Sequence, residues 1–230
     1  MLTAVPPSPV APELCLAHWT QTMQRSVLRQ MLAVVSRPGI LSFAGGLPAP
    51  ELFPTADYAA ALARVLADDP RALQYGPPFA PLKAHIVRLM AERGVDCDEE
   101  QIFITTGAQQ ALDVLARLLL DPEGEVMLEE IVYPGIQQAV APACPTVLPV
   151  RTDLTTGIEV DDVIDHLERR ARPAFLYVIP DAHNPLGVSV SEEKRRRLAE
   201  VAEAYRLPIV EDDPYGFLAY DGRCAPPVRA

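Results

Sequence analysis

The stretch that decides the fold is FLYVIPDAHNPLGVSVSEEKRRRLAEVAEAYRLPIVEDDPYGF, residues 175–217. Phe175 to Ile179 is a short apolar run, typical of a strand that is buried on both faces. After a polar turn, Ser191 and the two glutamates behind it predict the start of a helix. Leu207 to Glu211 predicts a second buried strand, which runs into Asp212. A strand–helix–strand unit of this kind predicts parallel strands, whose carboxyl ends lie at one edge of the sheet.

Two polar loops follow the two predicted strands. Asn184-Pro185-Leu186-Gly187 comes after the first strand, and Asp212-Asp213-Pro214-Tyr215 comes after the second. Each loop alone is ordinary turn chemistry, because Asn-Pro and Asp-Asp-Pro both favour turns. Open α/β sheets, however, bind their ligands at the carboxyl ends of the strands. We therefore expect Asn184 and Asp212 to face the same crevice.

Composition narrows the class of protein. The chain has 230 residues, of which 49% are hydrophobic, enough for one sizeable domain. Its formal net charge of -11 argues against nucleic acid or an anionic membrane as the main partner. The four cysteines form no CxxC pair and no metal-ligand cluster. We therefore expect no metal site. No signal peptide and no apolar run of membrane-spanning length is visible, so we expect a cytoplasmic protein.

The first part of the chain predicts mainly helices. Residues 1–13 are expected to be a disordered tail, followed by a helix from about Leu16 to Ser36. Further helices are expected over Ala56–Ala67 and Leu82–Arg93. We divide the chain at about residue 70, into residues 1–70 and residues 71–230.

The middle of the chain predicts strands and a site for an anion. Strands are expected at Ile102–Thr105, Glu125–Glu129 and Thr146–Val150, and a helix over Asp161–Arg170. Between the first two strands, Gly107, Ala108 and Gln109 open a helix. A strand, small residues and a helix N-terminus together offer free N–H groups and a dipole that favour phosphate. This signal is weak by its spacing alone, because it matches neither a Walker A loop nor GxGxxG.

With this turn and the two later loops taken together, the sequence resembles the fold-type I pyridoxal 5′-phosphate (PLP) enzymes. Within them it is similar to class I and II aminotransferases, in the branch of aminoadipate and aromatic aminotransferases. The resemblance covers residues 16–230 and corresponds to the arm and most of the large domain. It implies an α/β fold, a three-layer αβα sandwich with a mostly parallel sheet that is incomplete at its C-terminal end. The strand order it implies is 3-2-4-5-6-7-1, where the strands are counted along the chain from Ile102–Thr105 as strand 1 to Leu207–Glu211 as strand 5. Leu186 stands where the family more often has Thr.

The resemblance implies PLP as cofactor and Asp212 as the carboxylate beside the protonated ring nitrogen. The other roles that it implies are hydrogen bonds from Asn184 and Tyr215 to the ring's phenolic oxygen, phosphate binding by Gly107, Ala108 and Gln109, and stacking of Tyr133 on the ring. It also implies that Gly46 meets the substrate carboxylate, and that Tyr75 reaches the cofactor phosphate of a partner subunit. We therefore expect a homodimer that acts on an amino acid and a 2-oxo acid.

One central residue of the family is missing. The Schiff-base lysine lies in a Ser-x-Ser-Lys segment after the Asp-x-x-Tyr loop, and here the only lysines are Lys83 and Lys194, both before it. We expect the 230-residue chain to be inactive by itself, and Ile102–Thr105 to lack a neighbouring strand. Alternatives are a C–S lyase, a cyclopropane-forming synthase, a DNA-binding regulator with an aminotransferase-like module, and a lysine-free protein without catalysis.

Overall fold

The computed structural model describes residues 15–22, 39, 45–220, 222 and 225–229, and these divide into two compact units. The first unit contains the described residues up to 22, residues 88–97, and those from 105 onward. The second unit contains residue 39, residues 45–87 and residues 98–104. The tail expected over residues 1–13, and most of the helix expected from Leu16 to Ser36, lie outside the described residues.

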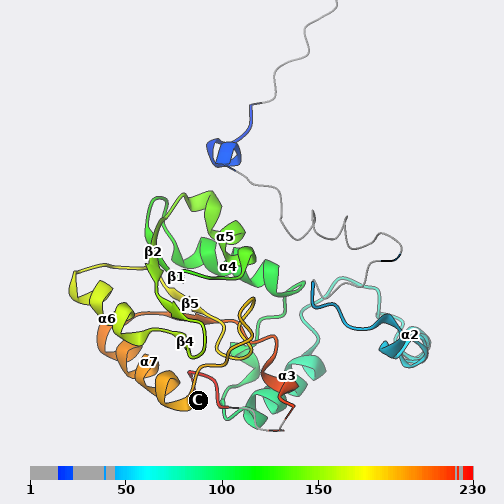
Figure 1. Cartoon of the computed structure of the whole chain (residues 1–230). Helices are drawn as coiled ribbons and strands as arrows, with labels where there is room; N and C mark the ends of the chain where they lie inside the picture. Colours follow the sequence, from blue (N-terminus) through cyan, green and yellow to red (C-terminus); the bar gives the residue numbers. More distant parts are fainter. Residues whose placement is uncertain (1–14, 23–38, 40–44, 221, 223–224, 230) are drawn as a thin grey trace, which may run out of the picture. The chain divides into compact units, whose positions relative to one another are not determined.

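A parallel sheet forms the centre of the first unit (Figure 1). Across the sheet its strands are β2 (Thr146–Val150), β1 (Glu125–Glu129), β5 (Leu176–Val178) and β6 (Ile209–Glu211). All neighbouring pairs are parallel, with Met127 opposite Leu176 and Tyr177 opposite Val210. The prediction of a mostly parallel α/β sheet is thus confirmed, and the strands predicted from residues 175–217 lie side by side.

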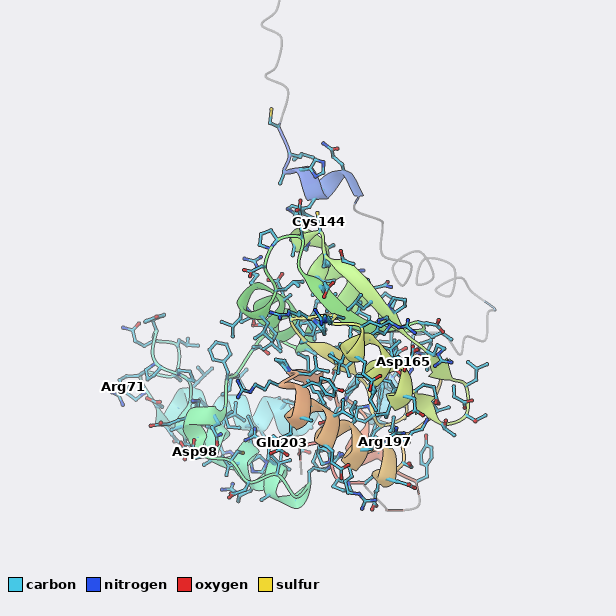
Figure 2. The ribbon with its side chains drawn as sticks, turned by 90° about the vertical axis from the view of Figure 1, so that its left-hand side faces the viewer. Arg71, Asp98, Cys144, Asp165, Arg197 and Glu203 are labelled. Carbon is cyan, nitrogen blue, oxygen red and sulfur yellow. The ribbon has the colours of Figure 1, made fainter. Side chains whose placement is uncertain are left out.

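Helices cover both faces of this sheet (Figure 1). α4 (Ala108–Leu119) and α5 (Pro134–Val140) pack on one face, and α6 (Val160–Glu168) and α7 (Glu192–Tyr205) pack on the other. Ser191 caps α7 as predicted, because its Oγ accepts a hydrogen bond from the Lys194 backbone N–H at 3.3 Å. Figure 2 shows the charged side chains of Asp165 on α6 and of Arg197 and Glu203 on α7 at the surface of the unit.

The central strands divide their side chains between two cores, because successive residues of a strand point to opposite faces. Leu128 and Tyr177 pack with α4 and α5, whereas Met127 and Leu176 pack with α6 and α7. All four side chains are at most 1% exposed. Burial of a large apolar side chain contributes about 1.5–3 kcal/mol, so these two cores hold the three layers together.

One predicted strand is not a strand in this structure. Ile102–Thr105 pairs with no described strand, and its Phe103 side chain is 79% exposed. A strand is defined by hydrogen bonds to a neighbour, and β-branched residues alone do not supply them. The described sheet has β6 at one edge and β2 at the other.

A short hairpin was not expected from the sequence. β3 (Thr152–Asp153) pairs in antiparallel fashion with β4 (Gly157–Ile158). The Thr155 hydroxyl, followed by the backbone N–H groups of Thr155 and Thr156, lowers the pKa of Asp153 to about 2. Strands of this length carry no readable periodicity, so the hairpin depends on this turn.

The remaining helices are α2 (Thr55–Asp68) and α3 (Ala80–Glu92), with 3-10 turns at His18–Thr22, Pro50–Leu52, Glu99–Gln101, Ala141–Ala143 and Gly216–Leu218. In the second unit, Asp98 and Gln101 form a capping box around the turn that begins at Glu99. α2 has no buried residue. Within the described part of the chain, none of the helices is both long and apolar enough to cross a membrane.

Candidate functional site

The predicted site residues of the first unit lie on segments that begin at one edge of the sheet. The carboxyl ends of β1, β5 and β6 share this edge, and the loops behind them carry Tyr133, Asn184 and Asp212 respectively. α4 is tied to the first of these loops, because Gln109 Nε2 donates a hydrogen bond to Gly135 O at 2.9 Å. This edge is where α/β sheets place their ligand sites.

Asp212 is held to the strand beside it through both backbone and side chain. Its N–H donates to Val178 O at 2.9 Å, and its Oδ2 accepts a hydrogen bond from the Tyr177 hydroxyl at 2.6 Å. Burial, and next the hydrogen bond to Asp212, raises the pKa of the Tyr177 phenol. The phenol therefore stays protonated and acts as the donor of this pair.

Asp213 is engaged differently from its neighbour. Its Oδ2 lies 2.9 Å from Nη1 of the buried Arg93, and its Oδ1 accepts from the Gly216 N–H at 2.7 Å. A Cβ on Gly216 would overlap the Arg93 guanidinium, so glycine is required for this close approach. Arg93 also lies 5.2 Å from the centroid of the Phe217 ring. Asp213 thus shapes the loop.

A buried network of ion pairs joins the loops that carry Asn184 and Asp212. Arg93 Nη2 lies 3.1 Å from Asp181 Oδ2, while its Nη1 pairs with Asp213. Arg195 binds the same Asp181 in a bidentate way, with distances of 2.7 and 3.1 Å. Arg93 and Arg195 thereby fix the start of the Asn184 loop to the Asp212 loop and to α7.

The loop around Asn184 is a tight turn. The peptide bond between Asn184 and Pro185 is cis. Gly187 has a positive φ of 71° and donates its N–H to His183 O, and the His183 N–H donates to Val188 O at 2.7 Å. The Asn184 side chain is half-buried.

A second buried pair stands behind this loop. His183 Nε2 lies 3.0 Å from Glu129 Oε2, and both side chains are 1% exposed. The two atoms are close, yet neither His183 ring nitrogen makes a hydrogen bond within the described residues. The His183 ring and the Glu129 carboxylate are therefore in close polar contact without the alignment of a hydrogen bond. Neither residue was predicted to belong to the site.

The N-terminus of α4 has the properties that favour an anion. Gly107 is its N-cap with a positive φ of 79°, and no side chain caps the helix. A Cβ at Gly107 would meet nothing within 4 Å, so the space beside it is open. Gly107, Ala108 and Gln109 are all exposed. The first turn therefore offers backbone N–H groups and the positive end of the helix dipole.

Tyr133 is the N-cap residue of α5 and is half-buried. A Cβ at Gly135 would overlap the Tyr133 ring and lie 2.5 Å from Gln109 Oε1. Gly135 is thus the close contact that brings the Tyr133 ring toward the start of α4. Tyr215 is also half-buried, and its carbonyl oxygen accepts from the Leu218 N–H at 2.8 Å.

Two predicted residues belong to the second unit. Gly46 is exposed with a positive φ of 58°, and Tyr75 is 98% exposed. Their roles stay predictions. Tyr177, Arg93 and Arg195 were not predicted as site residues: the phenol sits inside an apolar run, and both arginines lie in predicted helices. An aromatic with a hydroxyl in a fully buried strand was the signal available, since such a hydroxyl needs a partner.

Both lysines are occupied by other contacts. Lys83 Nζ donates to Glu99 O at 2.8 Å within the second unit. Lys194 Nζ lies 2.8 Å from Glu159 Oε1 and donates also to Thr156 and Ile158 oxygens. Neither lysine therefore offers an unengaged amine.

Comparison with known proteins identifies relatives of this arrangement. Residues 44–230 match the family described as aminotransferase class I and II. The chain is 41% identical over 196 residues to 2-aminoadipate transaminase of Thermus thermophilus, which covers 84% of this chain and 48% of the relative. It is 35% identical over 216 residues to aromatic-amino-acid aminotransferase 1 of Thermococcus litoralis, covering 90% and 52%.

A solved structure of a relative has a similar fold. The α-aminoadipate aminotransferase LysN of Thermus thermophilus, complexed with N-(5′-phosphopyridoxyl)-L-leucine, superimposes with a TM-score of 0.82 at 37% identity. The match covers 93% of this chain and 52% of that chain. The chain thus spans about half the length of the relatives it matches.

Proposed function

Because the chain belongs to the class I and II aminotransferase family, we propose that its site serves PLP-dependent transfer of an amino group between an amino acid and a 2-oxo acid. One observation carries the proposal. The Asp212 carboxylate, held at 2.6 Å by a buried phenol, shares a sheet edge with the Asn184 loop and with the uncapped start of α4.

The residues present fit the cofactor at both of its ends. The phosphate needs an anion site, and the open space at Gly107 beside an uncapped helix start provides one. The ring nitrogen needs a carboxylate that stabilises its protonated form, and Asp212 is an oriented carboxylate. PLP supplies, when bound, an electron sink for the carbon that exchanges its amino group.

The side chains of this chain have separate tasks in the proposal. Asp212 holds the proton on the ring nitrogen, and Asn184 and Tyr215 donate hydrogen bonds to the ring's phenolic oxygen. Gly107, Ala108 and Gln109 bind the phosphate through the start of α4, and Tyr133 lies against the ring face. An offset aromatic contact of that kind adds about 0.5–1.5 kcal/mol.

The second unit contributes the proposed substrate contact and the proposed dimer contact. Gly46 offers a backbone N–H to the substrate carboxylate, because a glycine allows close approach. Tyr75 reaches the cofactor phosphate of a partner subunit, which agrees with its almost complete exposure in a single chain. We assign residues 1–70 to the tail and arm and residues 71–230 to the large domain, in a cytoplasmic homodimer.

The cofactor assignment is tested by binding. Pyridoxamine 5′-phosphate, which needs no lysine, is titrated into the chain by calorimetry. We expect saturable binding that is lost in Asp212→Ala and kept in the exposed control Tyr205→Phe. Absence of binding to the unsubstituted chain would refute the cofactor site.

The reaction is tested separately. A catalytically active form of the protein is incubated with 2-aminoadipate or an aromatic amino acid as amino donor and with 2-oxoglutarate as acceptor. Stoichiometric glutamate supports amino transfer, whereas release of ammonia, or of a thiol from a thioether donor, favours a lyase on the same fold.

A further inference from the structure

We propose that Tyr177 is a positioning residue of the cofactor site: its buried phenol fixes the Asp212 carboxylate in the orientation that receives the ring nitrogen. This inference rests on the proposed function. It adds to it a residue that does not touch the cofactor and acts through Asp212.

The contact has the geometry of a strong hydrogen bond. The Tyr177 hydroxyl and Asp212 Oδ2 are 2.6 Å apart, within the range of charge-assisted O–H···O⁻ bonds. Tyr177 is 0% exposed, so water does not compete for its proton. β5 and β6 are neighbours in the sheet, and Asp212 follows β6 directly. The register of two strands therefore sets this contact.

The bond leaves one side of the carboxylate open. Oδ2 is taken by Tyr177, and no hydrogen bond to Oδ1 is found among the described residues. The Asp212 N–H donates to Val178 O, so the backbone cannot swing the side chain away. One oxygen is thus anchored, and the other can accept a proton-bearing ring nitrogen.

Asp212 would be less ordered without the phenol. Its side chain is only half-buried, so a carboxylate released by Tyr177 can turn toward water. Binding would then have to restore the orientation and strip that water, which costs free energy that the anchored carboxylate avoids. A purely packing role predicts something different: Phe would fill the same space, and any loss would be the same for every ligand.

Two ligands separate these roles. Pyridoxamine 5′-phosphate has the ring nitrogen, and its 1-deaza analogue has a C–H in its place. Their dissociation constants are measured for the 230-residue chain, Tyr177→Phe, Asp212→Asn, the double variant, and the control Tyr205→Phe.

We expect Tyr177→Phe to weaken pyridoxamine 5′-phosphate about tenfold, the lower end for a hydrogen bond to a charged group, and the deaza analogue less than about twofold. The double variant should bind no more weakly than Asp212→Asn alone, because the two residues act as one unit. Tyr205→Phe should change neither constant.

Equal weakening of both ligands by Tyr177→Phe would leave only a packing role and overturn the inference. If the unsubstituted chain binds neither ligand, the proposed function fails and the inference with it. If Tyr177→Phe does not fold, NMR of the unsubstituted chain supplies the test. In chain labelled with ¹³Cζ-tyrosine, the Tyr177 resonance should shift with pyridoxamine 5′-phosphate and not with the deaza analogue, and equal responses would overturn the inference.

Discussion

Replacement of Arg195 by Met tests whether the buried ion network holds the site loops. Arg195 is 2% exposed, and all five of its N–H donors are used. Two donate to Asp181, and three donate to the carbonyl oxygens of Val190, Pro180 and Pro226 at 2.9–3.0 Å. Met fills much of the same space and makes none of these bonds.

The magnitude follows from what is left behind. Loss of one partner of a buried ion pair costs about 3–5 kcal/mol, and Asp181 keeps only Arg93. An unpaired buried carbonyl at Val190 adds about 1 kcal/mol. Pro180 O still accepts from the Val190 N–H, and Pro226 is exposed to water, so both add little. We expect a loss of about 4–6 kcal/mol in total, which at this chain length lowers Tm by roughly 10–20 °C.

The assay is thermal unfolding followed by circular dichroism, at low protein concentration and with gel filtration to confirm a single species. Arg196→Met is the matched control, because Arg196 is the next residue of α7 and is exposed. Arg195→Lys keeps the charge, but it should lose most of the free energy that Arg195 contributes, since an ammonium cannot make five directed bonds. If Arg195→Met unfolds within about 1 kcal/mol of Arg196→Met, the network does not hold the loops.

Three further predictions follow from neighbouring groups. Asp212→Ala should lower kcat of an active enzyme far more than Asp213→Ala, whereas Asp213→Ala should cost roughly 2 kcal/mol of stability through the lost Arg93 pair; equal kcat losses would contradict this. Burial raises the pKa of Glu211 above its ordinary 4.5 despite the hydrogen bond from the Val228 N–H. Ionisation of Glu211 therefore destabilises the fold, and the free energy of unfolding falls as pH rises through the folded pKa. Glu211→Gln should raise Tm at pH 7 but not at pH 4. The exposed control Glu200→Gln should raise Tm at neither pH. Finally, borohydride reduction of the 230-residue chain with PLP should leave no stoichiometric pyridoxyl-lysine and no turnover, because both lysines are engaged elsewhere; a single labelled lysine with activity would refute this.

Much of the architecture was readable from local pattern. The apolar runs at 125–129, 146–150, 175–179 and 207–211 predicted the strands, and Ser191 marked the start of α7. These signals are local, because burial on both faces requires consecutive apolar residues and a helix start requires a cap. The order of the loops was enough to predict that Asn184 and Asp212 follow neighbouring strands.

Which strands pair, and which partner each side chain meets, were decided only by the tertiary structure. Ile102–Thr105 has the composition of a strand, but a strand exists only where another backbone accepts its hydrogen bonds. Asp212 and Asp213 are adjacent and chemically identical, and they differ because one meets Tyr177, 35 residues earlier, while the other meets Arg93. Such contacts join residues far apart in sequence, and only the register of the sheet and the packing of the helices bring their atoms within bonding distance.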